Sequence, residues 1–179
     1  PLPARNPARR VDWNVIAEIR NHWKATSGDK TLILSIFASA FFYMIAATLL
    51  PIVTSYGKYL ELDPTETAGL NGATVIGIAV GAVVAGLMSR QRVEAGLVPI
   101  GLFGIAVSLM SVQFNPESYW HAGTCLLFAG MFAGMFSVPI RALIQLRPKD
   151  TERGAILGLS EVLDFVGILL AGAVVAILA

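Results

Sequence analysis

The sequence predicts an all-α membrane protein with five transmembrane helices. Of its 179 residues, 55% are hydrophobic and only 14% are charged, and the mean hydropathy is +0.69. A soluble domain of this length could not bury so much apolar surface. The chain also contains five apolar stretches of the length that a helix needs to cross a bilayer, which is about 20 residues.

Charged residues divide the predicted transmembrane domain, which covers residues 31–179. The five spans lie at about 31–56, 67–89, 95–114, 119–140 and 154–179. The first four contain no charged residue, whereas Glu161 and Asp164 interrupt the fifth. The chain begins without Met and ends within an apolar run, so we expect it to be a piece of a longer protein.

The basic residues predict the orientation of the spans. Six Lys or Arg residues precede the first span, two lie at 90–94 and four lie at 141–153, whereas the alternate connections contain only Lys58. The positive-inside rule then predicts that the N-terminus and the two basic connections are cytoplasmic.

The first 30 residues divide into two segments. Residues 1–10 contain three prolines without apolar periodicity, which is typical of a linker. Residues 11–30 place Trp13, Ile16 and Trp23 on one helical face beside basic residues, which predicts an amphipathic cytoplasmic segment on the membrane surface. The alternative is a helix that packs on a soluble domain.

Small residues recur at helical spacing in the second and fourth spans. The second contains "GIAVG" at 77–81, with Gly72 before it and Gly86 after it, and the fourth contains "GMFAG" at 130–134. In lipid, small-residue faces permit the close approach that helix packing requires. These motifs predict a packed helix bundle but no particular function.

The sequence contains no motif of an enzyme or a metal site. It lacks a phosphate-binding glycine loop, a nucleophile elbow and a cluster of Cys and His residues with metal-ligand spacing. We therefore expect no catalytic activity, no cofactor, no metal and no nucleic-acid partner in this stretch. The candidate functional residues are the polar Asn71 and the ionisable Glu161 and Asp164, all within the spans. Burying a polar or ionisable side chain in a membrane is costly, so such residues often have a function.

Three stretches carry a resemblance to a known family. "GLMSRQRVEAGLVPIG" at 86–101, "VPIRALIQLRPKDTERGAILG" at 138–158 and "FFYMIAATLLPIV" at 41–53 resemble segments of the lysophospholipid transporters of the major facilitator superfamily. The resemblance implies that the five spans are helices seven to eleven, in the C-terminal half of the bundle. The N-terminal half of the same transporter would then be a partner. The sequence departs from the family pattern at Arg141, where a small or polar residue is expected, and at Ser160 and Glu161, where an Asn pair is usual.

The function implied by the resemblance is inward movement of a lipid substrate, chiefly lysophosphatidylethanolamine, across the bacterial cytoplasmic membrane by alternating access. One alternative is a major facilitator carrier for another small solute, such as a drug or a sugar. Another is that these helices form the membrane anchor of a fused acyltransferase.

For Glu161 and Asp164, the i, i+3 spacing places both carboxylates on one side of a helix. Three roles are open for the pair. They could bind the ammonium group of a zwitterionic substrate, one of them could carry a proton, or both could pair with a basic residue of the other half. The aromatic cluster of Phe41, Phe42 and Tyr43 is a weaker candidate for lining the path of an acyl chain.

A cytoplasmic gate is a further hypothesis. Arg90, Arg92 and Glu94 lie in a very short connection, where they could form an inner-face charge cluster with Arg153 and stabilise one state of the transport cycle. The alternative is that the arginines only anchor the topology.

Overall fold

The structure is a computed structural model that describes residues 29–89, 94, 96–150 and 152–178. The described residues form helices and no strand, which confirms the predicted all-α class. The elements are α2 (Lys30–Tyr59), α3 (Pro64–Met88), α4 (Leu97–Ser111) with the short 3-10 helix η1 (Val112–Phe114), α5 (Tyr119–Leu146) and α6 (Arg153–Leu178). Five segments, with α4 and η1 counted as one, are long and apolar enough to cross a membrane.

Local sequence signals explain where α2, α3 and α5 begin. Asp63 and Glu66 form a reciprocal capping box at the start of α3, and Pro64 occupies its first turn. The Asp29 carboxylate accepts hydrogen bonds from the first amides of α2, and the Ser118 hydroxyl accepts one at the start of α5. These side chains satisfy amides that have no partner within their helices.

The end of α5 differs most from the span drawn from the sequence. The predicted fourth span stops at residue 140 because Arg141 follows it, but α5 continues to Leu146. A charged residue ends an apolar window without ending a helix, since Arg is a good helix former. Arg141 therefore lies inside α5 and not in a connecting loop. The predicted linker at 1–10 and nearly all of the amphipathic segment at 11–30 lie outside the described residues.

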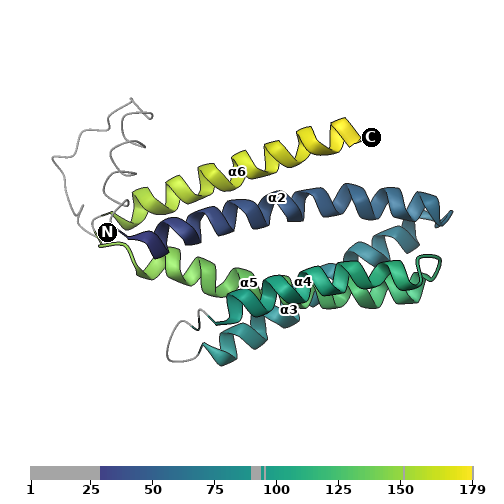
Figure 1. The fold of residues 1–179 in the computed structure, drawn as a ribbon, viewed down its shortest axis with the longest axis horizontal. Coiled ribbons are helices and arrows are strands. Elements are labelled where there is room, and N and C mark those ends of the chain that lie inside the picture. Colours follow the sequence, from purple (N-terminus) through teal and green to yellow (C-terminus); the bar gives the residue numbers. More distant parts are fainter. Residues whose placement is uncertain (1–28, 90–93, 95, 151, 179) are drawn as a thin grey trace, which may run out of the picture.

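The helices form two groups (Figure 1). α2 and α6 lie side by side, while α5 packs against α3 and α4. α5 is the most buried of the five, because it also contacts α2 and α6. Successive helices alternate in direction, so the start of α2 and the connection between α5 and α6 lie at the same end of the bundle (Figure 1).

The closest helix contact joins the two glycine motifs. A Cβ atom added at Gly81 would lie 1.8 Å from the Met131 carbonyl oxygen, and one added at Gly130 would lie 2.1 Å from that of Thr74. Each helix therefore packs its backbone against the other where side chains are absent. This confirms the packing role predicted for the "GIAVG" and "GMFAG" motifs. Gly72 and Gly86 have no such contact among the described residues.

Candidate functional site

Five polar side chains from three helices lie close together. Ser39 and Tyr43 come from α2, Arg141 from α5, and Glu161 and Asp164 from α6. Arg141 lies five residues before the end of α5, about 8 Å along its axis. Asp164 lies eleven residues after Arg153, or about 16 Å into α6. We call these five residues the polar cluster.

Arg141 connects the three helices of the polar cluster. Its Nη1 donates to Glu161 Oε1 at 2.8 Å, and its Nη2 donates to the Tyr43 hydroxyl. The guanidinium carbon also lies 5.2 Å from the centre of the Tyr43 ring, within the range of a cation–π interaction. The same Nη2 lies 3.7 Å from Asp164 Oδ2, which is close enough for charge attraction but too long for a hydrogen bond.

The Asp164 carboxyl group is buried and incompletely hydrogen-bonded. Only 4% of its side chain is exposed. Its Oδ2 accepts a hydrogen bond from the Ser39 hydroxyl at 3.1 Å, whereas its Oδ1 has no hydrogen-bond partner among the described residues. A buried polar atom without a partner carries a desolvation cost, and such exceptions in a folded protein often mark functional groups.

Glu161 lies in a different environment although it is only three residues away. Half of its side chain is exposed, and Arg141 is exposed to 40%. The two acids thus share one cation, but one is accessible and the other is enclosed. One sequence hypothesis paired both acids with a basic residue of the other half of a transporter. In the structure, a partner comes from α5 of the same chain.

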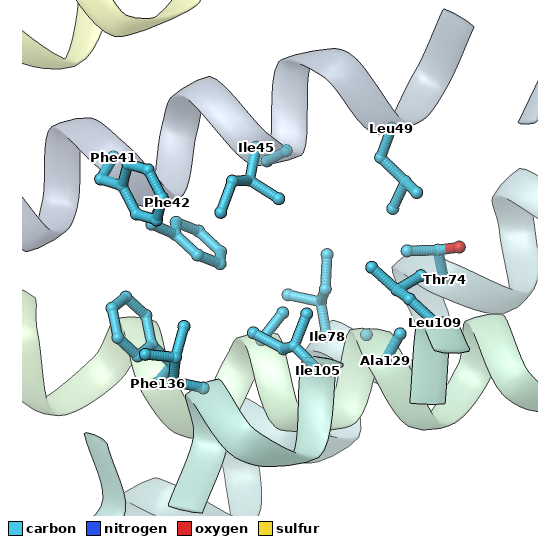
Figure 2. Close-up of a pocket in the computed structure, with 14 residues that line it drawn as sticks. Phe41, Phe42, Ile45, Leu49, Thr74, Ile78, Ile105, Leu109, Ala129 and Phe136 are labelled. Atoms are coloured by element: carbon cyan, nitrogen blue, oxygen red, sulfur yellow. The ribbon is translucent and has the colours of Figure 1, made fainter. Parts of the chain in front are cut away.

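An apolar cavity of about 120 Å³ lies between α2, α3, α4 and α5. Figure 2 shows side chains that line it, including Phe41, Phe42, Ile45 and Leu49 of α2, Ile78 of α3, Ile105 of α4 and Phe136 of α5. The one hydroxyl among its described lining residues is that of Thr74, which already donates to the Leu70 carbonyl within α3. The cavity therefore presents hydrocarbon surface and suits an apolar group.

Phe42 connects the cavity to the polar cluster. Its ring stacks on Phe136 across the cavity, with 5.3 Å between ring centres. On its other side it meets the Tyr43 ring edge to face at 5.6 Å, and Tyr43 accepts the hydrogen bond from Arg141. The polar cluster and the apolar cavity are thus neighbours, and the contact between Phe42 and Tyr43 joins them.

Asn71, the third candidate predicted within a span, lies elsewhere. Its side-chain amide donates to the Thr67 carbonyl one turn earlier in α3, at 3.3 Å. It is partly buried and is not among the residues that line the cavity or form the polar cluster. The structure therefore gives Asn71 a local partner, and its role in binding stays a prediction.

The predicted gate residues are only partly described. Arg90 and Arg92 lie outside the described residues, and Glu94 is exposed shortly before α4. Arg153 forms an ion pair with Asp150, with 2.9 Å between Nη2 and Oδ1. This contact joins residues three apart in the chain and does not involve Glu94. The gate stays a prediction.

A second ion pair lies at the same end of the bundle. Arg147 Nη1, just after α5, donates to both carboxylate oxygens of Asp29, at 2.6 and 2.8 Å. Asp29 also caps α2 through the amides of Thr31 and Leu32. The hydrogen bond from Arg147 is the main reason that the pKa of Asp29 lies below its usual value, and the two amides act in the same direction.

Three members of the polar cluster are not predicted to meet the two acids. The sequence places Arg141 among the basic residues of a cytoplasmic connection and Ser39 among the polar residues within a span. It makes Tyr43 a weaker candidate for the acyl path. One signal was available, since the resemblance implies that Arg141 and Glu161 both depart from the family pattern, and the two residues carry opposite charges. Such paired departures are consistent with two residues that contact each other.

Comparisons with known proteins agree with the resemblance seen in the sequence. A family model described as Major Facilitator Superfamily matches residues 1–172. The lysophospholipid transporter LplT of Serratia proteamaculans is 28% identical over 159 residues, which cover 84% of this chain and 38% of that protein.

Proteins of the same name are similar over shorter segments. The LplT of Klebsiella pneumoniae is 38% identical over 83 residues, which cover 46% of this chain and 20% of that protein. That of Salmonella paratyphi B is 36% identical over 90 residues, or 50% of this chain and 22% of that protein. The chain thus spans well under half the length of these relatives. No solved structure matches it significantly.

Proposed function

We propose that this chain, which belongs to the major facilitator superfamily, forms part of a carrier that moves lysophospholipid across a membrane. Membership of this transporter family agrees with the expectation that the chain is not an enzyme. It also agrees with the five helices that are long and apolar enough to make a multi-pass membrane protein. The matched relatives are named as lysophospholipid transporters, which supports this substrate class.

The observation that supports this function best is the position of the polar cluster beside the apolar cavity. A lysophospholipid has a charged headgroup and a single acyl chain. Arg141 offers a guanidinium to a phosphate, and Glu161 and Asp164 offer carboxylates to an ammonium group. The cavity beyond Phe42 offers an apolar surface to the start of the acyl chain.

The finer proposal is that the substrate is lysophosphatidylethanolamine and that it moves inward across the bacterial cytoplasmic membrane by alternating access. The end of the bundle that contains Asp29 and Arg147 is then cytoplasmic, in agreement with the positive-inside rule. The other half of the same transporter completes the binding site. Arg90, Arg92, Glu94 and Arg153 are the proposed inner gate, with the topology role of the arginines as its alternative.

The test is uptake of lysophosphatidylethanolamine by the complete transporter that contains this chain, reconstituted in lipid vesicles. Replacement of Arg141 by Gln is expected to lower uptake about tenfold or more, because a charge-assisted contact with the phosphate is lost. Arg147→Gln is the matched control, since Arg147 is equally exposed and also forms a hydrogen-bonded ion pair with a carboxylate, but lies outside the polar cluster.

Two other results would contradict the proposal. Uptake of an unrelated drug or sugar, without uptake of lysophospholipid, would favour a carrier for a small solute. Absence of any uptake, together with acyltransferase activity that needs these helices only for membrane attachment, would favour the anchor role.

A further inference from the structure

The contact between α2 and α6 contains a line of buried polar side chains. Ser39 faces Asp164 across the contact, and its hydroxyl donates to Oδ2 at 3.1 Å. Ser35 and Ser160 lie one turn earlier in the two helices and are also buried. Because α2 and α6 run in the same direction (Figure 1), the pairing of Ser39 with Asp164 places Ser35 opposite Ser160. We call these four residues the polar seam.

The charges beside the polar seam do not balance. Arg141 forms its hydrogen-bonded ion pair with Glu161, whereas its Nη2 lies 3.7 Å from Asp164 Oδ2. With all three groups ionised, one cation serves two carboxylates, and one negative charge remains. A buried charge without a counter-charge is costly within a membrane. One further positive charge beside Asp164 would balance the three groups, whereas a divalent ion would leave an excess of positive charge.

Asp164 Oδ1 is the atom at which a cation can bind. It is buried without a hydrogen-bond partner among the described residues, and only 4% of the Asp164 side chain is exposed. Carboxylate and hydroxyl oxygens are the ligands that hard inorganic cations prefer. The Ser39 hydroxyl donates its hydrogen to Asp164 and therefore keeps a lone pair available to a cation. The polar seam thus combines a negative charge with neutral oxygen ligands.

The packing around Asp164 favours a small ion. One turn later in α6, a Cβ atom added at Gly167 would lie 2.4 Å from the Ala40 carbonyl oxygen, so the two helices are in close contact there. A proton needs only one oxygen, whereas the buried hydroxyls beside the carboxylate offer the several ligands that a metal ion requires. A small monovalent metal ion therefore suits the polar seam.

We propose that Asp164, Ser39 and Ser160 form a binding site for a sodium ion between α2 and α6. The bound ion joins the two helices and balances the carboxylate charge that Arg141 leaves over. Its binding does not depend on which substrate the transporter moves.

The test is thermal unfolding of the complete transporter in detergent at constant ionic strength and neutral pH. Sodium chloride replaces the chloride of N-methyl-D-glucamine, a large organic cation, in steps. Sodium should raise the unfolding temperature of the wild type until the site is saturated, because a ligand of the folded state stabilises it. Potassium should have a smaller effect at equal concentration. Asp164→Asn should abolish the sodium effect, and Ser39→Ala should raise the half-saturating concentration about tenfold.

Arg141→Gln distinguishes a bound cation from a purely structural role of Asp164. The substitution removes a competing positive charge from the vicinity of Asp164, so the half-saturating sodium concentration should fall about threefold or more. The control is Ser111→Ala, which removes a hydroxyl that donates to the Val107 carbonyl at the end of α4 and should leave the sodium effect unchanged.

Three results would overturn the sodium site. The wild type could show no saturable response to sodium, or Asp164→Asn could respond as the wild type does. A transporter that acidification stabilises but sodium does not would have a proton at Asp164 instead. None of these results depends on uptake, so each would leave the proposed function intact, and a failure of lysophospholipid uptake would leave the sodium site intact.

Discussion

The α3–α5 interface and the polar cluster both join helices of one bundle, but by different physical means. At the interface, Gly77 and Gly81 face Gly130 and Gly134, and backbone meets backbone without room for a methyl group. In the cluster, long charged side chains bridge α2, α5 and α6 and leave one buried oxygen without a partner. The first region is fully packed and favours one arrangement. The second leaves Asp164 Oδ1 without a partner among the described residues, and it is the candidate binding site.

The largest expected effect is at the glycine interface. Gly81→Leu should lower the free energy of unfolding of the complete transporter by about 3 kcal/mol or more, because the added atoms overlap the Met131 backbone. Thermal unfolding in detergent measures this change. Gly86→Ala, in the same helix, has nothing within 4 Å of the added Cβ among the described residues and should be neutral or stabilise by up to about 1 kcal/mol. Equal effects of the two substitutions would contradict the close packing.

Asp164→Asn should separate binding from stability. The Ser39 hydroxyl can still donate to the amide oxygen, and the buried charge disappears, so the unfolding temperature should stay the same or rise. Uptake of lysophosphatidylethanolamine should fall about tenfold or more if Asp164 helps bind the ammonium group. An unfolding temperature that falls while uptake is unchanged would indicate a structural role only.

The proton-carrier hypothesis for Asp164 is tested with the same variant. Uptake is measured in vesicles with and without a proton gradient. If Asp164 carries the proton, Asp164→Asn should abolish the response to the gradient. Retained uptake that still responds to the gradient would exclude Asp164 as the carrier.

A smaller effect is expected in the apolar cavity. Ala133→Leu partly fills it and should reduce uptake of long-chain lysophospholipid by about threefold to tenfold, the loss expected when a few methylene groups leave an apolar site. Short-chain analogues should be less affected. Ala106→Leu, at an exposed position of α4, is the control and should not distinguish chain lengths. Loss of uptake that is independent of chain length would remove the cavity from the acyl path.

The smallest effect concerns the ion pair at the end of the bundle. Because the pKa of Asp29 is lowered on folding, its contribution to stability is fully present above the pKa of the unfolded chain. It is lost as the pH falls through the lower folded value. Asp29→Asn retains a good helix cap but loses the Arg147 pair, and should cost less than about 1 kcal/mol. Unfolding followed between about pH 5 and about pH 2, a range that brackets the reference carboxyl pKa of about 3.9, should show a weaker acid dependence in the variant. An unchanged acid dependence would show that the pair is not responsible.

The five helices could be predicted because hydrophobic composition acts locally. The start of α3 was not predicted correctly, since the predicted span begins at 67, whereas the capping box of Asp63 and Glu66 starts the helix at Pro64. The end of α5 could not be found in this way, because Arg141 resembles a membrane boundary in the sequence although the helix continues beyond it. The glycine motifs indicated close packing, but not that α3 and α5 are the two partners.

The candidate site shows the same division. The sequence by itself determined that five apolar helices form and that two acids lie within the last of them, since both follow from composition and helical spacing. Only the tertiary structure decided that Arg141 and Ser39 meet those acids, that Asp164 is enclosed while Glu161 is accessible, and that Asn71 bonds within its own helix. Contacts between helices depend on rotation and register, and residues 39, 141 and 164 come together only when three separate helices pack.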